Sequence, residues 1–323
     1  MLRGLETVTP PLVRSVLTVG NFDGVHRAHQ HLLGQARRFS SEKGGPVVAL
    51  TFEPHPLTVV APSKVPPRLC SADDKLRYLA QAGADWVVVA KSEPALLTME
   101  AERFIEEVLI ARFHPIHIVE GPSFGFGRGR KGNPAVLRRV AVPLGCEVHI
   151  VEPVTILGDE GETLMVSSSL IRRLIAETKV EQAALCLGRP YALTGEVVQG
   201  DRRGRTIGFP TANLSVSEQL IPGDGVYAGR ASAGGPTYSC AISVGHTPTF
   251  GGTAQRLEAH LLDFDGELYG RTMRLEFDRL LRHQRKFDSA SGLVDQLRRD
   301  VEAVRSRANR SDQGTQEPAA PRA

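Results

Sequence analysis

The sequence predicts an α/β domain with a doubly wound parallel sheet, followed by an antiparallel β-barrel and a C-terminal helix. In the first half, continuous apolar runs alternate with stretches of helical periodicity, which is typical of buried parallel strands joined by helices. From about residue 187 the apolar runs are short and are separated by Gly, Pro and Asp, which favours a barrel. A helix is expected over 289–305. We therefore expect domains over 1–185 and 186–306 and a disordered tail over 307–323.

Length and composition exclude several classes of protein. A chain of 323 residues can bury two separate cores, and its net charge of +3 argues for neither a nucleic-acid nor a membrane partner. No apolar run approaches the roughly 20 residues that span a bilayer. The four cysteines are far apart and form no C-x-x-C pair, which favours reduced thiols in the cytoplasm over a zinc site or a disulfide framework. The sequence is compatible with an oligomer but does not predict one.

The apolar runs and the helical periodicity define the expected elements in order. Strands of the sheet are expected over 15–19, 46–52, 85–90, 116–119 and 146–151, and helices over 71–82 and 99–113. Ser71 and Asp74 are spaced as a capping box at the start of the first of these helices. Barrel strands are expected over 193–199, 206–214, 225–231, 237–244, 256–264 and 272–277. Ligands of doubly wound sheets bind beyond the carboxyl ends of the strands, where the strand order reverses.

The first strand leads into a segment suited to binding phosphate, Gly20–His29 (GNFDGVHRAH). A tight turn follows the strand, and a helical pattern begins at the histidines. The first turn of a helix offers unpaired backbone N–H groups and the positive end of the peptide dipoles to an anion. His26 and His29 are three residues apart and should project from one face as neutral donors. Without the surrounding G-x-F-D-G segment, such a pair would be more typical of surface or capping histidines.

This segment resembles the signature of the HxGH nucleotidyltransferases, and specifically of the bacterial bifunctional riboflavin kinase/FAD synthetases. The resemblance implies that His26 and His29 act in catalysis. It also implies an ATP site in the first domain that includes Gly20, Phe22, Asp23, Gly24, His26 and His29. Ala28 departs from the pattern, because glycine is usual there.

Two further loops follow predicted strands of the first domain. Prolines fix the loop Thr51–Pro56 (TFEPHP), which alone predicts only a rigid turn; the resemblance implies that Glu53 and His55 lie at the nucleotide and flavin site. Within the loop Gly121–Asn133, residues 127–132 formally match G-x-G-x-x-G, but these glycines do not directly follow a strand, and no acidic residue lies about 20 positions on to bind a ribose. The resemblance implies instead a loop near the nucleotide and flavin phosphates, with Phe124, Arg128, Arg130 and Lys131. Ser123 stands where Asp or Asn is usual.

The segment Val166–Arg173 (VSSSLIRR) ends the first domain's motifs. Serines before an amphipathic helix are typical N-caps. The resemblance implies that Ser167, Ser168, Ser169 and Arg172 bind the triphosphate of ATP. Ser169 replaces the usual threonine and keeps a hydroxyl.

The second half resembles the riboflavin kinase domain along its length. The run Gly208–Asn213 (GFPTAN) is its most specific segment; its local pattern alone predicts an edge strand interrupted by a proline. The resemblance implies that Thr211 and Asn213 hold Mg²⁺ and ATP phosphates. The implied ATP site of the kinase consists of Gly200, Gly204, Arg205, Gly208, Thr211 and Asn213. Three residues depart from the usual pattern: Ser243 (usually Asn), His246 (usually Arg or Lys) and Gln284 (commonly acidic).

The two implied reactions make different chemical demands. A primary alcohol needs a carboxylate to accept its proton before it attacks ATP, and the resemblance assigns this role to Glu258, although strand alternation alone would make it an outward-facing residue. The FMN phosphate is already ionised and needs no base. The expected enzyme therefore uses riboflavin, FMN and ATP with Mg²⁺. Alternatives are a nucleotidyltransferase for another phosphorylated small molecule with a flavin-binding barrel, a flavin sensor, or a nucleic-acid-binding protein that uses the Arg/Gly loop.

Overall fold

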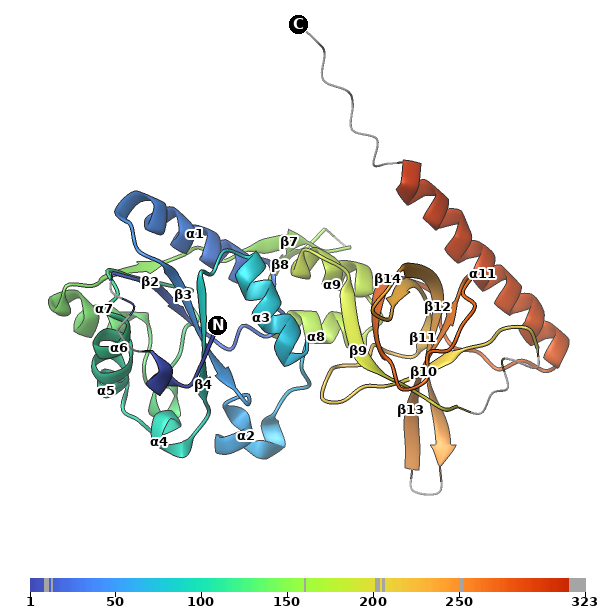
Figure 1. The fold of residues 1–323 in the computed structure, drawn as a ribbon, viewed down its shortest axis with the longest axis horizontal. Coiled ribbons are helices and arrows are strands. Elements are labelled where there is room, and N and C mark those ends of the chain that lie inside the picture. Colours follow the sequence, from blue (N-terminus) through green and yellow to red (C-terminus); the bar gives the residue numbers. More distant parts are fainter. Residues whose placement is uncertain are drawn as a thin grey trace, which may run out of the picture. The chain divides into compact units, whose positions relative to one another are not determined.

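The computed structural model describes residues 1–8, 12, 14–159, 161–200, 204, 207–249 and 252–313, without the side chains of 247–249, 252–254, 290 and 307–313 (Figure 1). The chain forms two compact units, Met1–Leu170 and Ile171–Ala323. No helix in the described ranges is long and apolar enough to cross a membrane.

The first unit is built on a six-stranded parallel sheet, as predicted. The strands have the order β1-β4-β3-β2-β5-β6, and every neighbouring pair is parallel. Their bounds are β1 Leu2–Arg3, β2 Val16–Val19, β3 Val47–Glu53, β4 Trp86–Lys91, β5 His117–Glu120 and β6 Glu147–Ile150. The chain moves from β2 to β3 and β4 in one direction and returns to β5 and β6 on the other side. Strand order therefore reverses between β2 and β5, and the loops that follow β3, β2 and β5 meet at one edge.

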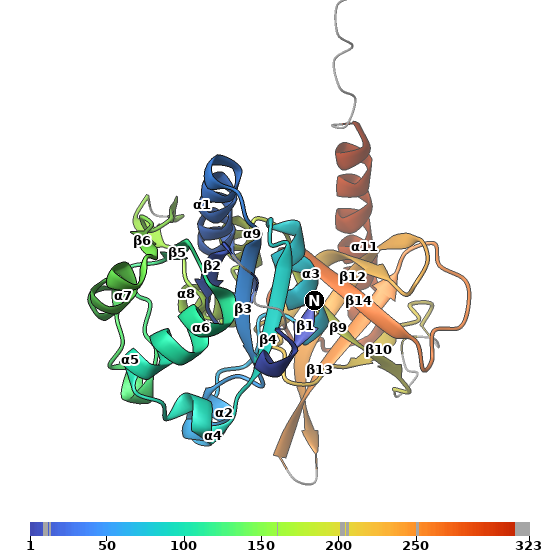
Figure 2. The ribbon, with the colours of Figure 1, turned by 60° about the vertical axis from the view of Figure 1, so that its left-hand side comes forward.

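Helices cover both faces of this sheet (Figures 1 and 2). On one face α1 (Arg27–Lys43) and α3 (Ala72–Gln81) pack their apolar sides on strand residues such as Val16 and Val47. Ser71 caps α3, and its hydroxyl accepts from the backbone N–H of Asp74, as predicted. Strands buried on both faces need apolar residues at successive positions, which explains the continuous apolar runs of the sequence.

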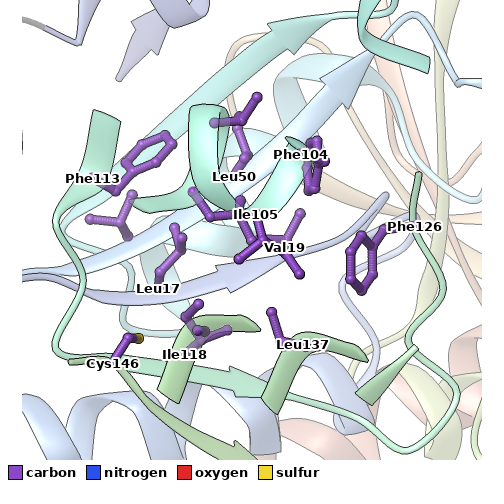
Figure 3. Packing of buried hydrophobic residues seen from close by; sticks show 14 of the residues in the cluster. Leu17, Val19, Leu50, Phe104, Ile105, Phe113, Ile118, Phe126, Leu137 and Cys146 are labelled. Atoms are coloured by element: carbon purple, nitrogen blue, oxygen red, sulfur yellow. The ribbon is translucent and has the colours of Figure 1, made fainter. Parts of the chain in front are cut away.

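The opposite face carries a helix with an unexpected winding. The helix expected over 99–113 consists of α5 (Ala101–Arg103), a π-helical segment over Phe104–Ile110 and α6 (Ala111–Phe113). Figure 3 shows Phe104 and Ile105 packed near Val19 and Ile118 of the sheet. Apolar spacing identifies the buried face of a helix, and an α-helix and a π-helix can both bury that face. The spacing therefore predicts a helix here but not whether its hydrogen bonds are of the α or the π type.

The remaining elements of the first unit are short. They are the helices α2 (Leu57–Val60), α4 (Pro94–Leu97) and α7 (Pro134–Ala141), the 3₁₀ turns Leu5–Thr7, Pro62–Lys64, Arg128–Arg130 and Val142–Leu144, and the antiparallel pair β7 (Thr155–Leu157) and β8 (Thr163–Met165). The helix α8 (Ser168–Ala176) contains the boundary between the two units, and α9 (Val180–Leu187) follows it.

The second unit is a closed antiparallel barrel with strand order β10-β13-β12-β11-β14-β9, as predicted. The bounds are β9 Tyr191–Val198, β10 Ala212–Ser215, β11 Gly225–Ser232, β12 Thr237–Thr249, β13 Gly252–Leu261 and β14 Thr272–Arg282. Thr206, where this strand is expected to begin, lies outside the described residues, and from Ile207 onward the strand begins only at Ala212. Gly208 has a φ of 84° and Pro210 has no N–H to donate, so the chain joins the ladder only after them.

A long C-terminal helix, α11 (Ala290–Gln313), packs on the barrel. It passes the expected end at Arg305 and enters the segment expected to be disordered, of which residues 314–323 lie outside the described part. Val304 packs with Ala228 and Leu262 of the barrel. Asp300, which is 4% exposed, accepts hydrogen bonds from the guanidinium of Arg282 at 2.9 and 3.1 Å.

Candidate active sites

The turn between β2 and α1 holds strained backbone. Phe22 and Val25 have φ values of 49° and 39°, in a region that side chains other than glycine rarely adopt, and Gly24 has a φ of 76°. Phe22 is 3% exposed and lies under Gly20, whose added methyl group would be 3.2 Å from the Phe22 ring. Strained backbone persists only where the surrounding fold stabilises it, and it is concentrated at binding and catalytic sites.

His26 and His29 come together at the start of α1, as their spacing predicts. Their rings stack at a centroid distance of 3.6 Å, and the Phe22 ring meets His29 edge-on at 5.1 Å. Burial, and then the neighbouring His26, lower the pKa of His29 well below its ordinary value, so this imidazole is neutral near pH 7. His26 is the N-cap residue, and its side chain makes no capping hydrogen bond. The first turn of a helix has backbone N–H groups without an intrahelical partner, and these groups suit an anion.

The serine segment is joined to this turn. The Ser168 hydroxyl donates to the backbone carbonyl of Asp23 at 3.2 Å, although the two residues are 145 positions apart. Ser167 accepts from the backbone N–H of Leu170 at 3.2 Å and so caps α8, as the N-cap pattern predicts. The Asp23 carboxylate accepts from the backbone N–H of Leu69 at 3.0 Å, which gives this side chain a structural role. Ser169 and Arg172 lie further along α8.

Glu53 is the last residue of β3, His55 lies two residues beyond it, and both side chains contact neighbouring residues. Glu53 forms ion pairs with Arg68 at 2.6 Å and with Lys75 at 2.9 Å. Burial alone would raise the pKa of Glu53, but Lys75 and Arg68 outweigh it and lower this pKa below its ordinary value. A ring nitrogen of His55 lies 3.3 Å from the side-chain nitrogen of Asn21, in the turn after β2. The loops that follow β2 and β3 are thus in contact, as expected for the edge where they meet.

The Arg/Gly loop that follows β5 is held partly by its aromatic residues. Phe124 and Phe126 stack at a centroid distance of 4.8 Å, and Phe126 is 7% exposed in the core cluster. Arg128 pairs with Glu100 at 3.1 Å on the surface, and such a pair is worth only about 0–1 kcal/mol, so a phosphate can displace it at small cost. The Arg130 guanidinium lies against Gly125, whose added methyl group would be 2.8 Å from it.

Glu120 is a buried carboxyl group of this region that sequence reasoning missed. It is 3% exposed at the end of β5, and its Oε1 accepts from the backbone N–H of Val19 at 2.6 Å. β5 pairs with β2 only at Val16 and Leu17, so the pairing does not extend to Val19. The Glu120 side chain instead accepts the hydrogen bond from the Val19 N–H. Burial raises the pKa of Glu120 well above its ordinary value. A lone acidic residue at the end of an apolar strand was the signal in the sequence.

In the barrel, the expected kinase residues lie on neighbouring strands. Glu258 on β13 is directly opposite Asn213 on β10 and Ser243 on β12, so the three side chains face the same side of the sheet. The Thr211 hydroxyl lies 3.4 Å from a carboxylate oxygen of Glu258. Leu257 and Ala259, on either side of Glu258, are 2% and 0% exposed, so Glu258 points away from the barrel core as its alternation predicts.

Two glycines lie against these side chains. A methyl group added at Gly200 would be 2.2 Å from the Asn213 amide, and one at Gly204 would be 2.3 Å from the backbone oxygen of Phe209. Gly200, Thr211 and Asn213 line a cavity of about 220 Å³ that the segment Phe264–Tyr269 closes on another side; Glu258 is not among its described lining residues. Gly208 lies in the turn before β10, and Arg205 lies outside the described residues.

The three departures in the barrel have identifiable partners. Gln284 donates to the Ser243 hydroxyl at 3.0 Å and to the Val244 carbonyl at 2.9 Å. His246 lies 2.9 Å from the carboxylate of Asp224. Two residues that differ from the family pattern, Ser243 and Gln284, therefore contact each other.

Comparison with known proteins gives the same order of domains. A sequence model described as FAD synthetase matches residues 10–169, and one described as riboflavin kinase matches residues 187–308. A bifunctional riboflavin kinase/FMN adenylyltransferase of Escherichia coli (strain K12) is 35% identical over 302 residues, which cover 93% of this chain and 95% of that protein. The protein of the same name from Bacillus subtilis (strain 168) is 34% identical over 303 residues, covering 92% and 93%.

A solved structure resembles the whole chain. A crystal structure described as a macrolide-efflux protein from Streptococcus pneumoniae has a TM-score of 0.84 and 31% sequence identity, and the match covers 94% of this chain and 99% of that one. The parallel sheet and the closed barrel thus occur together, in this order, in another protein.

Proposed function

Because the chain belongs to the bifunctional riboflavin kinase/FMN adenylyltransferase family, it forms FMN from riboflavin and FAD from FMN with ATP, and we propose that each unit carries one step. In this proposal the barrel phosphorylates riboflavin, and the sheet domain transfers AMP to FMN. The observation that carries the division is the separation of the candidate groups: the stacked His26–His29 pair belongs to the first unit, and the Thr211–Glu258 contact belongs to the second.

The adenylyl transfer needs anion binding rather than a base. An oxygen of the FMN phosphate attacks the α-phosphorus of ATP, the bond from that phosphorus to its bridging oxygen breaks, and pyrophosphate leaves. The site must hold two anions together and stabilise the charge on the leaving group. The first-turn N–H groups of α1 are suited to this task, with Gly20 and Gly24 letting the backbone approach a phosphate. The Ser167 hydroxyl accepts from Leu170 and can donate its own proton, whereas Ser168 would first have to release the Asp23 carbonyl.

His29 serves this step as a neutral donor. Its Nδ1 is buried and, among the residues described, has no hydrogen-bond partner. A buried N–H without an acceptor is costly, so the ring proton belongs on Nε2. In that tautomer Nε2 donates to a phosphate oxygen while the imidazole stays uncharged. A single oriented donor of this kind is worth about 3 kcal/mol in the transition state.

Phosphorylation of riboflavin needs a base. Glu258 accepts the proton of the primary hydroxyl as the oxygen attacks the γ-phosphorus of ATP and ADP leaves. Thr211, at 3.4 Å from one carboxylate oxygen, and Arg256, at 3.9 Å from the other, orient the Glu258 side chain. The glycines at 200 and 204 leave room beside Asn213 and Phe209 for the phosphates of ATP.

Both reactions use ATP with a divalent metal ion, and in the kinase the residues present fit Mg²⁺. Thr211, Asn213 and Glu258 offer oxygen atoms, which Mg²⁺ prefers, and methyl groups at Gly200 and Gly204 would fill the space beside them. Thr211 and Asn213 would hold the ion, which would neutralise charge on the ATP phosphates. The four free cysteines, all buried, support a cytoplasmic enzyme with reduced thiols.

Single substitutions test the division of the two steps. In His29→Ala we expect FAD formation from supplied FMN to fall at least about a hundredfold while FMN formation is unchanged. In Glu258→Gln we expect FMN formation from riboflavin to be lost while FAD formation from supplied FMN continues. Incubation with riboflavin or FMN, ATP and Mg²⁺, followed by chromatography of the flavins, measures both steps.

Two exposed residues provide controls for this experiment. His31→Ala on α1 and Glu302→Gln on α11 remove the same side-chain types from the surface and should leave both products unchanged. If folded His29→Ala lost FMN and FAD formation equally, the proposed division between the units would be wrong.

A further inference from the structure

Three side chains converge on β5 and β6: His117 and Glu147 begin these strands, and His149 is the third of the four residues of β6. His117 Nδ1 and His149 Nε2 are 3.0 Å apart, and a carboxylate oxygen of Glu147 lies 3.8 Å from the first and 3.7 Å from the second. Within the described ranges, they form the only group of three His, Cys, Asp or Glu residues whose donor atoms lie this close together. None of the three takes part in the proposed reactions.

The fold brings these residues onto one face of the sheet. His117 is opposite Glu147 in the parallel pair β5–β6, and His149 is two residues beyond Glu147, so the three side chains point the same way. On that face Phe39 of α1 stacks on His149 at a centroid distance of 3.9 Å and on His117 at 5.2 Å. The loops of the adenylyl-transfer site follow the carboxyl ends of the strands. His117 and Glu147 begin β5 and β6, so these two ligands lie at the opposite end of the strands from those loops.

Hydrogen bonding alone does not explain the position of Glu147. The two imidazole nitrogens are at hydrogen-bond distance, but distances of 3.7 and 3.8 Å are too long for a hydrogen bond from either ring to the carboxylate. The carboxylate oxygen is instead nearly equidistant from both nitrogens. A point equidistant from the three atoms lies about 2.1 Å from each, which is the bond length of zinc to imidazole nitrogen and carboxylate oxygen.

We propose that His117, Glu147 and His149 bind a zinc ion that ties the edge strand β6 to β5. Two imidazoles and one carboxylate are a donor set that suits Zn²⁺. His117 is 3% exposed, whereas the Glu147 side chain is 68% exposed, so water can reach the open side and supply the fourth ligand. β6 has a neighbour on one side only and pairs over four residues, so a metal link adds to a short ladder at the sheet's edge.

Zinc titration of the full chain tests this site. With ATP absent, wild-type protein should take one equivalent of Zn²⁺ from a chromophoric chelator, and His149→Gln should bind it at least tenfold more weakly. Glu147→Gln, which keeps the size of an exposed side chain, should also weaken binding. Cobalt in place of zinc should give the visible absorption of a tetrahedral site in wild type and not in His149→Gln.

Controls separate this site from other histidines and from misfolding. His31→Gln, at an exposed position of α1, should retain the full equivalent, and so should His29→Ala in the proposed catalytic pair. Zinc should raise the unfolding temperature of wild type and not that of His149→Gln. With both flavin products still formed by His149→Gln, an unchanged zinc affinity in that variant would overturn the proposal and mark the binding as adventitious.

Discussion

At the scale of single residues, Ser243 and Gln284 illustrate how a departure from a family pattern can be matched by a second one. Where the family usually has Asn and an acidic residue, this chain has a hydroxyl that accepts from an amide at 3.0 Å. The same amide donates to the Val244 carbonyl at 2.9 Å. A carboxylate at position 284 could not donate this hydrogen bond and would place a second acceptor beside the carbonyl oxygen. Both members of this contacting pair therefore depart from the family pattern.

A double-mutant cycle tests this pairing. Gln284→Glu alone should lower kcat/KM for FMN formation about tenfold, because the carboxylate repels the Val244 carbonyl and displaces Ser243 from the row that holds Glu258. Ser243→Asn together with Gln284→Glu should recover most of that loss, because the Asn amide can donate to the carboxylate. Additive effects of the two substitutions would show that the residues act independently.

Glu120 carries a pH dependence that can be assigned to one group. Its pKa in the folded chain lies above its ordinary value of 4.5, so the stability that its protonated form contributes is complete below that value and is lost as pH rises toward the folded pKa. Glu120→Gln keeps an oxygen to accept from Val19 and does not ionise. It should raise the free energy of unfolding by about 1 kcal/mol at about pH 7.5 and by little at about pH 4.

Fluorescence is suited to this measurement. Trp86 is the single tryptophan and lies in β4 of the same unit, so its emission follows the unfolding of that unit in denaturant. An equal gain at both pH values would mean that the substitution acts by packing and not by removing a titrating group.

At the scale of elements, the docking of α11 depends on a buried ion pair. Asp300 accepts from Arg282 of β14 and also from the side-chain amide of Gln296 at 2.8 Å. The Arg282 side chain is only 16% exposed, so removal of Asp300 leaves a buried charge without this partner. Asp300→Ala should therefore cost about 3 kcal/mol and expose the helix 290–313 to protease.

The same helix offers a matched control for this substitution. Asp295 pairs with Arg298 on the surface, with both side chains more than half exposed. Asp295→Ala should change the free energy of unfolding by less than about 0.5 kcal/mol and leave the rate of cleavage unchanged. Equal effects of the two substitutions would contradict a special role for the Arg282–Asp300 pair.

The elements that the sequence predicts well are those whose burial is uniform. Strands such as β2, β3 and β4 are buried on both faces, so continuous apolar runs reveal them. The short strands β7 and β8 have half-buried and exposed residues and give no such run, so they were not predicted. In the site, the spacing of His26 and His29 predicts their contact, because both positions belong to one helix turn. The Ser243–Gln284 contact needs the barrel to close, and no local pattern encodes it.

At the scale of the whole molecule, the two proposed steps share FMN. His29→Ala and Glu258→Gln should each retain one of the two proposed steps, so an equimolar mixture of the two variants should form FAD from riboflavin. FMN must then leave one chain and enter another, which predicts a lag that shortens when protein concentration rises and disappears when FMN is supplied. If the mixture made FMN but no FAD, transfer within one chain would be required.

The hydrogen bond from Ser168 to Asp23 also has a consequence for synthesis. It joins the turn of the proposed nucleotide site to a residue 145 positions later in the chain. While the polypeptide is still emerging from the ribosome, its sheet can assemble strand by strand, since domains fold from the amino terminus. The proposed site stays incomplete until α8 has been translated, so a nascent chain stalled before that helix should have a folded sheet that does not bind nucleotide.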